Sequence, residues 1–362
     1  MFNEVRLMNK EKVLIAMSGG VDSSVTALLM QEKGYECVGC TMKLADHKNK
    51  DAKCGSEQDL KDAEAVAARI GIPFYVADYR KEFSQIVIGR FIQDYKEGRT
   101  PNPCIICNRY MKFGYLFQKA KELGCKYVAT GHYVRIKYDE TKGRYLLLKA
   151  EDPKKDQSYV LYCLTQEQLA HAKFPLGDEP NKEHVRELAE SQGFVNANKS
   201  ESQDICFVKG ESYSEFIEKR TQKKFAPGNF VDEAGNVLGK HKGIIHYTVG
   251  QRKGLGLALP APMYVKEINV AKNEVVLTDN AGLFTTKVIA KDINLIDCER
   301  IVGVRRVKAR IRYHHVEQLA SVRQLDDDTL EIIFDEPQRA ITKGQSVVMY
   351  EEDVVVGGGI IM

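Results

Sequence analysis

The chain has 362 residues, of which 43% are hydrophobic and 28% are charged. This length allows two or three domains with their own cores, and the composition is that of an ordinary globular protein. The formal net charge is only +3, which excludes a uniformly basic nucleic-acid-binding surface. Any such surface must be a local patch.

The cellular setting follows from what the chain lacks. No apolar run is long enough to span a bilayer, and the charged first residues lack the apolar segment of a signal peptide. We therefore expect a cytoplasmic protein with no membrane partner. In a reducing compartment its nine cysteines are expected to be catalytic, metal-binding or simply buried, rather than structural disulfides.

Residues 12–31 have the pattern of a buried strand, a glycine turn and a helix. The apolar run 13–17 ends in SGG at 18–20, and VDSS at 21–24 opens an apolar-periodic segment. Such a turn directs backbone N–H groups and the positive end of a helix dipole at one point, which favours an anion. The string is neither a Walker P-loop, since no Gly-Lys-Ser/Thr follows, nor a GxGxxG dinucleotide fingerprint.

This stretch resembles the pyrophosphate-binding loop of the ATP pyrophosphatase (PP-loop) enzymes. Those enzymes split ATP between its α- and β-phosphates and adenylate an oxygen of their substrate. The resemblance implies ATP. We expect Mg²⁺ beside the phosphates as a counter-charge, although no dedicated cage of carboxylates is visible in the sequence.

Strands and helices alternate after this loop, which predicts an α/β fold with a doubly wound parallel sheet. The β-rich runs lie at 36–44, 74–77 and 127–130, and the helical patterns at 60–70, 83–95 and 110–123. Ligands gather at the carboxyl ends of parallel strands. The loops after Met17, Met42 and Thr130 are therefore expected to surround one nucleotide.

Residues 98–113, GRTPNPCIICNRYMKF, place two cysteines after a rigid turn. Prolines on both sides of Asn102 favour an extended backbone, and Asn108 is a candidate N-cap for a following helix. Cys107 would then lie just before a helix N-terminus, a position that lowers a thiol pKa and favours the nucleophilic thiolate. The alternative is that Cys104 and Cys107 are a pair of buried, inert cysteines.

Motifs in a fixed order resemble the tRNA-specific 2-thiouridylases (tRNA-uridine 2-sulfurtransferases) over nearly the whole chain. They are SGGVDSS at 18–24, GRTPNP at 98–103 followed by Cys107-Asn108, ATGHY at 129–133, KDQSY at 155–159 and SQDICF at 202–207. Enzymes of that family adenylate the C2 oxygen of the wobble uridine in tRNA and replace it by sulfur from a cysteine persulfide. The resemblance implies tRNA and a sulfur-donor protein, a cysteine desulfurase or a sulfur relay, as partners.

The resemblance also implies a role for each matching residue. Cys107 matches the catalytic cysteine and Cys206 the persulfide carrier, and thiol exchange between them would free sulfide or leave a disulfide. The ATP-binding positions are Ala16, Met17, Ser18, Gly19, Gly20, Val21, Asp22, Ser23, Met42 and Gly131. The segment that meets the target base is Asn102, Pro103 and Cys104. The further tRNA contacts are His132, Lys155, Asp156, Gln157, Arg312, Tyr313 and Gln345. From the residues alone, His132 is equally well explained as a core histidine.

Cys104 departs from the family pattern, because many members carry an aspartate there as a candidate acid/base group. The three thiolates of Cys104, Cys107 and Cys206 would be enough to ligate an iron–sulfur cluster with one open iron, as in some related tRNA-thiolating enzymes. The other interpretation is that Cys104 is a third thiol near the persulfide site.

The remainder of the chain is β-rich, and three domains are expected, at 1–210, 211–279 and 280–362. Alternating runs from about residue 280 predict a C-terminal antiparallel β-barrel behind a small β-rich central domain. Within the barrel, residues 306–313 alternate strictly, so that one face of a strand carries Arg306, Lys308, Arg310 and Arg312. This face suits an RNA backbone, or serves as a charged edge strand that resists aggregation.

Two other functions fit parts of the sequence. A PP-loop ligase or amidotransferase that adenylates a small metabolite would use the glycine loop, but would have no use for Cys107, Cys206 or the cationic strand. A non-catalytic RNA-binding protein would keep the cationic strand, but would not need an intact SGGVDSS loop or both cysteines.

Overall fold

The computed structural model describes residues 10–45, 56–200, 205–208 and 210–362. The chain divides into two compact units that are discontinuous in sequence. The first unit comprises residues 1–84, 107–139 and 145–206, and the second comprises residues 85–106, 140–144 and 207–362. Among the described residues, no helix is both long and apolar enough to cross a membrane.

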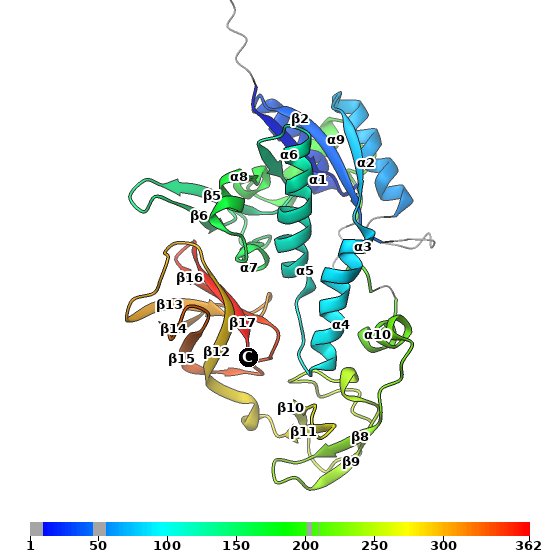
Figure 1. Cartoon of the computed structure of the whole chain (residues 1–362), viewed down its shortest axis with the longest axis vertical. Coiled ribbons are helices and arrows are strands. Elements are labelled where there is room, and N and C mark those ends of the chain that lie inside the picture. Colours follow the sequence, from blue (N-terminus) through cyan, green and yellow to red (C-terminus); the bar gives the residue numbers. More distant parts are fainter. Residues whose placement is uncertain (1–9, 46–55, 201–204, 209) are drawn as a thin grey trace, which may run out of the picture. The chain divides into compact units, whose positions relative to one another are not determined.

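A five-stranded parallel sheet forms the centre of the first unit (Figure 1). Its strand order is β3-β2-β1-β4-β7, and every neighbouring pair is parallel. The strands are β1 (Lys12–Ala16), β2 (Glu36–Lys43), β3 (Phe74–Asp78), β4 (Tyr127–Ala129) and β7 (Ala172–Lys173). The two strands next to β1 lie on opposite sides of it, so the loops that follow β1, β2 and β4 emerge at one edge.

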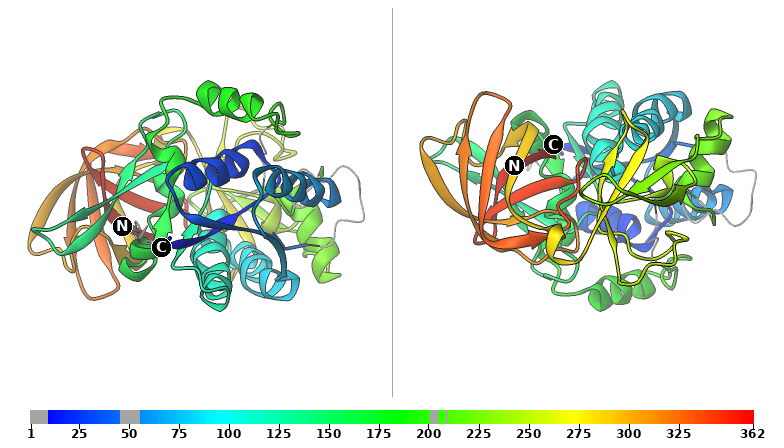
Figure 2. Two further views of the ribbon diagram at one scale, coloured as in Figure 1. Left: turned by 90° about the horizontal axis from the view of Figure 1, so that it is seen from above. Right: turned by 90° about the horizontal axis from the view of Figure 1, so that it is seen from below.

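Helices cover both faces of this sheet, as Figure 2 (left) shows for α1 and α9 on one side and α6 on the other. The helices are α1 (Val21–Glu32), α2 (Glu57–Ile70), α6 (Leu116–Glu122) and α9 (Lys182–Ser191). Val13 and Ile15 of β1 pack with α1, α2 and α9, whereas Leu14 packs with α6. The alternation of buried side chains along β1 therefore supplies two cores, and the predicted doubly wound α/β fold is confirmed.

Shorter elements complete the first unit. They are α3 (Arg80–Phe83), the π-helical η2 (Cys107–Tyr115), β5 (Val134–Asp139), α7 (Ser158–Leu161), α8 (Gln166–His171) and η3 (Pro175–Asp178). Strand β6 (Arg144–Lys149) neighbours β5. A second π-helical segment is η1 (Ser84–Ile88), of which Ser84 belongs to the first unit and residues 85–88 belong to the second.

A four-stranded sheet lies in the second unit, with the order β10-β11-β8-β9. Its strands are β8 (Gly228–Val231), β9 (Val237–His241), β10 (Tyr264–Asn269) and β11 (Glu274–Thr278). The pair β11–β8 is parallel and the other pairs are antiparallel. The helical elements of this unit are α4 (Gly89–Lys96), α5 (Pro103–Ile106), α10 (Tyr213–Thr221), η4 (Ile244–His246) and η5 (Ala281–Leu283).

Six antiparallel strands close into a barrel in the same unit. They are β12 (Phe284–Leu295), β13 (Val304–Arg310), β14 (Gln318–Gln324), β15 (Leu330–Arg339), β16 (Ser346–Glu351) and β17 (Val354–Ile361). The order is β12-β15-β14-β13-β16-β17, and β12 also pairs with β17. The predicted C-terminal barrel is thus confirmed, while the three-domain division at 210 and 279 stays a prediction.

Candidate functional site

The loop after β1 presents an uncapped helix N-terminus. Gly20 occupies the N-cap position of α1 with an extended backbone and makes no side-chain capping bond. No side chain at the N-cap position therefore accepts from the first N–H groups of this twelve-residue helix. The helix dipole adds positive potential at the same N-terminus. This is the geometry with which helix N-termini bind phosphate.

Gly19 is required at the turn for two reasons. Its φ of +75° lies in the left-handed region, and a Cβ at this position would lie 2.1 Å from the carbonyl oxygen of Asp59. The loop is further shaped by serines. The N–H of Ser18 donates to Ser23 Oγ at 3.2 Å, and Ser23 Oγ donates to the carbonyl of Gly20 at 2.9 Å. Ser18 itself is exposed, so its hydroxyl is accessible to a ligand.

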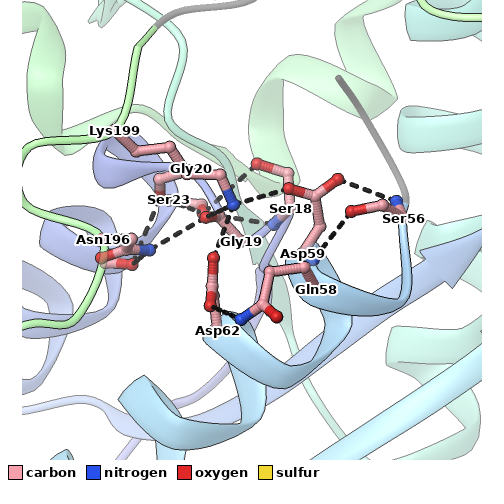
Figure 3. A network of polar contacts seen from close by, with 11 residues as sticks. Ser18, Gly19, Gly20, Ser23, Ser56, Gln58, Asp59, Asp62, Asn196 and Lys199 are labelled. Atoms are coloured by element: carbon pink, nitrogen blue, oxygen red, sulfur yellow. Dashed lines mark hydrogen bonds and ion pairs between the residues drawn. The ribbon is translucent and has the colours of Figure 1, made fainter. Parts of the chain in front are cut away.

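Two side chains from outside the motif donate to this loop, and two carboxylates hold one of these donors (Figure 3). Asn196 Nδ2 and Lys199 Nζ donate to the carbonyl oxygen of Gly19 at 3.0 and 3.1 Å. Lys199 Nζ also contacts Asp59 Oδ1 and Asp62 Oδ2, each at 2.6 Å. The backbone of the glycine loop is thereby connected to the first turns of α2 and to the segment after α9.

Asp22, in the first turn of α1, has two partners from elsewhere in the unit. Its Oδ1 accepts from Tyr133 Oη at 2.6 Å and from Lys182 Nζ at 2.5 Å. Lys182 is buried. A Cβ at Gly131 would lie 2.8 Å from the Cβ of Asp22, so only glycine fits against the start of α1. The predicted ATP-binding residues Asp22 and Gly131 are therefore in direct contact.

The other predicted ATP-binding residues surround the same edge of the sheet. Ala16 is the last residue of β1, and Met17 accepts at its carbonyl from Thr41 Oγ1 at 2.6 Å. Met42 is half-buried near the end of the neighbouring strand β2. Because β1, β2 and β4 are parallel neighbours, the sheet brings together the loops that the sequence indicated. Val21 and Ser23 are buried in the first turn of α1.

His132 is a buried histidine whose two ring nitrogens are both engaged. Lys112 Nζ lies 3.1 Å from Nε2, and Thr130 Oγ1 lies 2.6 Å from Nδ1. An ammonium group only donates, so Nε2 accepts and Nδ1 carries the proton. Burial, reinforced by the Lys112 charge, holds the His132 pKa well below 6.5. The ring is neutral at physiological pH, and its predicted contact with tRNA stays a prediction.

Two residues of the predicted tRNA-binding run 155–157 make hydrogen bonds within the first unit. Asp156 is buried and its carboxylate accepts from the N–H and Oγ of Ser158, at 3.1 and 2.8 Å. Gln157 Oε1 accepts from the N–H of Tyr133 at 3.0 Å, and the Gln157 N–H donates to the Tyr133 carbonyl. Lys155 is half-buried. Through Tyr133 this run is connected to Asp22 in the glycine loop.

The environment of Cys107 differs from the prediction. The helix starts at Pro103 in α5, and Cys107 is the first residue of the π-helical η2. Asn108 caps nothing, because it is buried and its Nδ2 donates to the carbonyl of Val160 at 2.9 Å. The expected helix N-terminus beside Cys107 is therefore wrong. Segments of π-helix occur frequently at functional sites, and this one carries a half-buried Cys107.

The predicted target-base segment and one predicted tRNA residue are brought together in the second unit. Asn102 Oδ1 accepts from the N–H of Cys104 at 3.1 Å, and Pro103 is buried at the first position of α5. Gln345 Nε2 donates to the carbonyl of Thr100 at 2.8 Å, and the Thr100 N–H donates to the carbonyl of Lys343. The barrel thus holds the turn that precedes Asn102.

The cysteines differ in burial and chemistry. Cys104 is exposed, and Cys206 is half-buried, next to residues 201–204, which lie outside the described part of the chain. In contrast, burial raises the pKa values of Cys37, Cys40 and Cys125 to about 11. Those three thiols stay protonated and are poor nucleophiles.

No ligand set for a metal ion is assembled in the described residues. No group of three or more His, Cys, Asp or Glu side chains there is placed to hold a metal. The iron–sulfur cluster considered for Cys104, Cys107 and Cys206 stays a prediction. The Mg²⁺ expected beside the phosphates of ATP stays a prediction.

Strand β13 confirms the predicted alternation but ends earlier than expected. Val307, Ala309 and Ile311 are buried, whereas Arg306 and Lys308 are exposed. The strand stops at Arg310, so Arg312 and Tyr313 lie in the turn that follows. Two of the four cations have acidic partners: Arg306 pairs with Asp335 at 2.5 Å, and Arg310 pairs with Glu317 at 2.7 Å. Arg312 is exposed and donates to the carbonyl of Arg339.

Sequence reasoning missed the residues that position the loop from a distance. They are Asp59, Asp62, Tyr133, Lys182, Asn196 and Lys199. Asp59 had one local signal, since Ser56 and Asp59 form a capping box at the start of α2. Tyr133 lies in the ATGHY motif at 129–133, which gave it no role of its own. The other four belong to no motif and are found only through tertiary contacts.

Family models match most of the chain. One described as tRNA methyl transferase HUP domain matches residues 11–210, one described as tRNA methyl transferase PRC-barrel domain matches residues 214–279, and one described as aminomethyltransferase beta-barrel domain matches residues 285–361.

Curated relatives are similar over nearly their full length. Proteins named tRNA-specific 2-thiouridylase MnmA are 52% identical in Clostridioides difficile, 49% in Acetivibrio thermocellus and 48% in Clostridium perfringens. Each match covers 98% of this chain, and 98%, 100% and 99% of the respective relative.

Proposed function

Because the chain belongs to the family of tRNA-specific 2-thiouridylases, we propose that it replaces the C2 oxygen of the wobble uridine of tRNA by sulfur, with ATP as the activating substrate. The observation that carries the ATP-dependent step is the uncapped N-terminus of α1 behind the Ser18-Gly19-Gly20 turn. The supporting residues for the sulfur step are Cys107 and Cys206, both in the first unit with that turn.

ATP supplies the activation that the uridine requires. The C2 carbonyl is a poor electrophile with no leaving group, and attack of its oxygen on the α-phosphorus releases pyrophosphate and leaves AMP attached to that oxygen. The N–H groups at the start of α1 and the exposed Ser18 hydroxyl are placed to bind the phosphates. We expect Mg²⁺ to balance their charge.

The sulfur step uses the two cysteines in different roles. Cys206 carries a persulfide, which a cysteine desulfurase or sulfur-relay protein loads. The Cys107 thiolate attacks the inner sulfur of that persulfide, which forms a Cys107–Cys206 disulfide and expels hydrosulfide. Hydrosulfide then displaces AMP from C2, and an external thiol reduces the disulfide before the next turnover.

The tRNA is proposed to contact both units. In the second unit the candidates are the turn at Asn102–Cys104, the exposed Arg312 and the half-buried Tyr313 and Gln345. In the first unit they are His132 and the run 155–157. Cations and an aromatic ring beside the turn after β13 suit phosphate contact and base stacking. A tRNA substrate also fits a protein of the cytoplasm.

The substitution Cys206→Ser separates the two chemical steps. With tRNA, ATP, Mg²⁺ and a desulfurase as sulfur source, the variant is expected to release pyrophosphate but to form no 2-thiouridine. Cys163→Ser, at a buried cysteine outside the proposed chemistry, is the matched control and should keep both products. A Cys206→Ser protein that still forms 2-thiouridine from the desulfurase would remove Cys206 as the sulfur carrier.

A further inference from the structure

The carbonyl oxygen of Gly19 receives two hydrogen bonds from a segment almost 180 residues further along the chain. Asn196 Nδ2 and Lys199 Nζ donate to it at 3.0 and 3.1 Å (Figure 3). Both donors follow α9 and lie in the first unit. Two side-chain donors on one loop carbonyl fix the orientation of that peptide.

Fixing this carbonyl also fixes a donor of the loop. A trans peptide is planar, so its C=O and the N–H of the next residue point in opposite directions, and none of the described peptides is cis. When the Gly19 carbonyl points at Asn196 and Lys199, the Gly20 N–H must point away from them. Gly20 is the N-cap residue of α1, so this N–H belongs to the proposed phosphate site.

Asn196 makes this bond while its side-chain oxygen is left without a hydrogen-bond partner. The side chain is buried, with 2% of its surface exposed, and its Oδ1 has no hydrogen-bond partner among the described residues. Its Nδ2 meanwhile donates to the Gly19 carbonyl and to Ser24 Oγ, both at 3.0 Å. A buried polar atom without a partner is destabilising. An apolar side chain would fill this position better if packing were its only role.

Lys199 adds a charge whose position is itself fixed. Asp59 Oδ1 and Asp62 Oδ2 lie 2.6 Å from its Nζ. Asp59 is also part of the capping box at the start of α2. These two carboxylates hold the Lys199 ammonium in place and raise its pKa against the effect of burial. The loop is thereby connected to the capped start of α2.

We infer that Asn196 and Lys199 are positioning residues of the nucleotide loop, which hold the Gly19 carbonyl so that the Gly20 N–H faces the phosphates of ATP. This inference rests on the proposed function, since it concerns the same ATP site. It assigns no contact with the substrate to either side chain.

The test is the ATP dependence of pyrophosphate release in the presence of tRNA. Lys199→Met removes the charged donor and is expected to raise KM for ATP about tenfold. Lys199→Arg keeps a cationic donor and should restore most of the affinity. Asn196→Leu removes both the donor and the unpartnered oxygen. It should raise KM for ATP several-fold while the melting temperature stays at or above that of wild type.

Arg69→Met is the matched control. Arg69 Nε donates to the carbonyl of Gln192, so this side chain also connects α2 to the segment after α9, but it does not touch the loop. The control should keep the wild-type KM for ATP. If Lys199→Met does not fold, the KM values for ATP of Lys199→Arg and Asn196→Leu still test the positioning role.

Two results separate this inference from the proposed function. A wild-type KM for ATP in both Lys199→Met and Asn196→Leu would overturn the positioning role while the function stands. An equal rise in Lys199→Met and Arg69→Met would also overturn it, because the effect would then be general. Failure of the wild-type protein to release pyrophosphate would instead contradict the proposed function itself.

Discussion

The glycine loop after β1 and the cationic strand β13 are both recognisable from short sequence patterns, but the structure completes them differently. In the loop, Asn196 and Lys199 bind the Gly19 carbonyl, and the N-terminus of α1 has no side-chain cap. In β13, the guanidinium groups of Arg306 and Arg310 are paired with carboxylates. A glycine pattern thus specifies a backbone geometry, whereas a charge pattern specifies a face and not what that face binds.

A substitution at Gly19 is expected to disturb the glycine loop most. Gly19→Ala places a Cβ 2.1 Å from the Asp59 carbonyl oxygen at a φ of +75°, so the loop must move. We expect pyrophosphate release to fall by about 100-fold, because displacements of about 1 Å at a reactive site have effects of this size. The measurement is pyrophosphate release at saturating tRNA.

Gly34→Ala is the control for backbone strain alone. Gly34 has a φ of +86°, and no atom of the described residues lies within 4 Å of the position that the alanine Cβ would take. The substitution therefore adds strain without a clash. It should lower the stability by about 1 kcal/mol and leave pyrophosphate release unchanged. If the two variants were equally active, the fit of the loop against Asp59 would have no functional importance.

The buried His132 predicts that the unfolding free energy depends on pH. The folded-state pKa of His132 is held well below 6.5 by burial and by Lys112. The unfolded chain therefore binds a proton at this histidine below about pH 6.5 while the folded chain does not. The unfolding free energy is expected to fall by about 1.4 kcal/mol per pH unit from this group as pH drops below about 6.5.

His132→Gln removes this titration while keeping a polar side chain. Native-state hydrogen exchange of the β4 amides, followed from pH 7 to pH 5, should show a shallower loss of stability than in wild type. His184, which is half-buried in α9, supplies the control His184→Gln, which should keep the wild-type slope. Identical slopes for His132→Gln and wild type would mean that the His132 ring accepts a proton in the folded state.

The cationic strand predicts the smallest effect. Lys308→Ala and Arg312→Ala, at exposed positions, are expected to weaken tRNA binding about two- to fivefold and to reduce the salt slope by about 1. Arg306→Ala should have less effect, because Asp335 already neutralises that charge. The measurement is tRNA affinity across a salt series. Equal losses of tRNA affinity at all three positions would show that the ion pair with Asp335 does not reduce the contribution of Arg306 to tRNA binding.

Sequence reasoning succeeded where local pattern determines structure. The parallel sheet, the glycine loop and the C-terminal barrel follow from periodicity and turn residues. The start of α5 was within reach but misinterpreted. Asn102-Pro103 is an N-cap residue followed by proline at the first helical position, and the Asn102 side chain does accept from the Cys104 N–H.

Other features depend on tertiary contacts and had no local signal. Asn108 looks like a cap, yet it is buried against Val160. Lys199 is an ordinary polar residue in sequence, and its role depends on Asp59, Asp62 and the Gly19 carbonyl meeting at one point. The partner of Arg306 lies on β15, two strands away. Patterns of single segments contain none of this information.

The most direct test is nucleoside mass spectrometry of unmodified tRNA after incubation with the protein, ATP, Mg²⁺ and a sulfide donor without oxygen. We expect ATP-dependent exchange of one oxygen for sulfur at the wobble uridine, with one pyrophosphate released per exchange. Pyrophosphate without thiouridine would keep the adenylation but contradict the sulfur step. If neither pyrophosphate nor thiouridine formed, ATP-dependent thiolation of tRNA would be contradicted, and a small-metabolite substrate for the loop would be favoured.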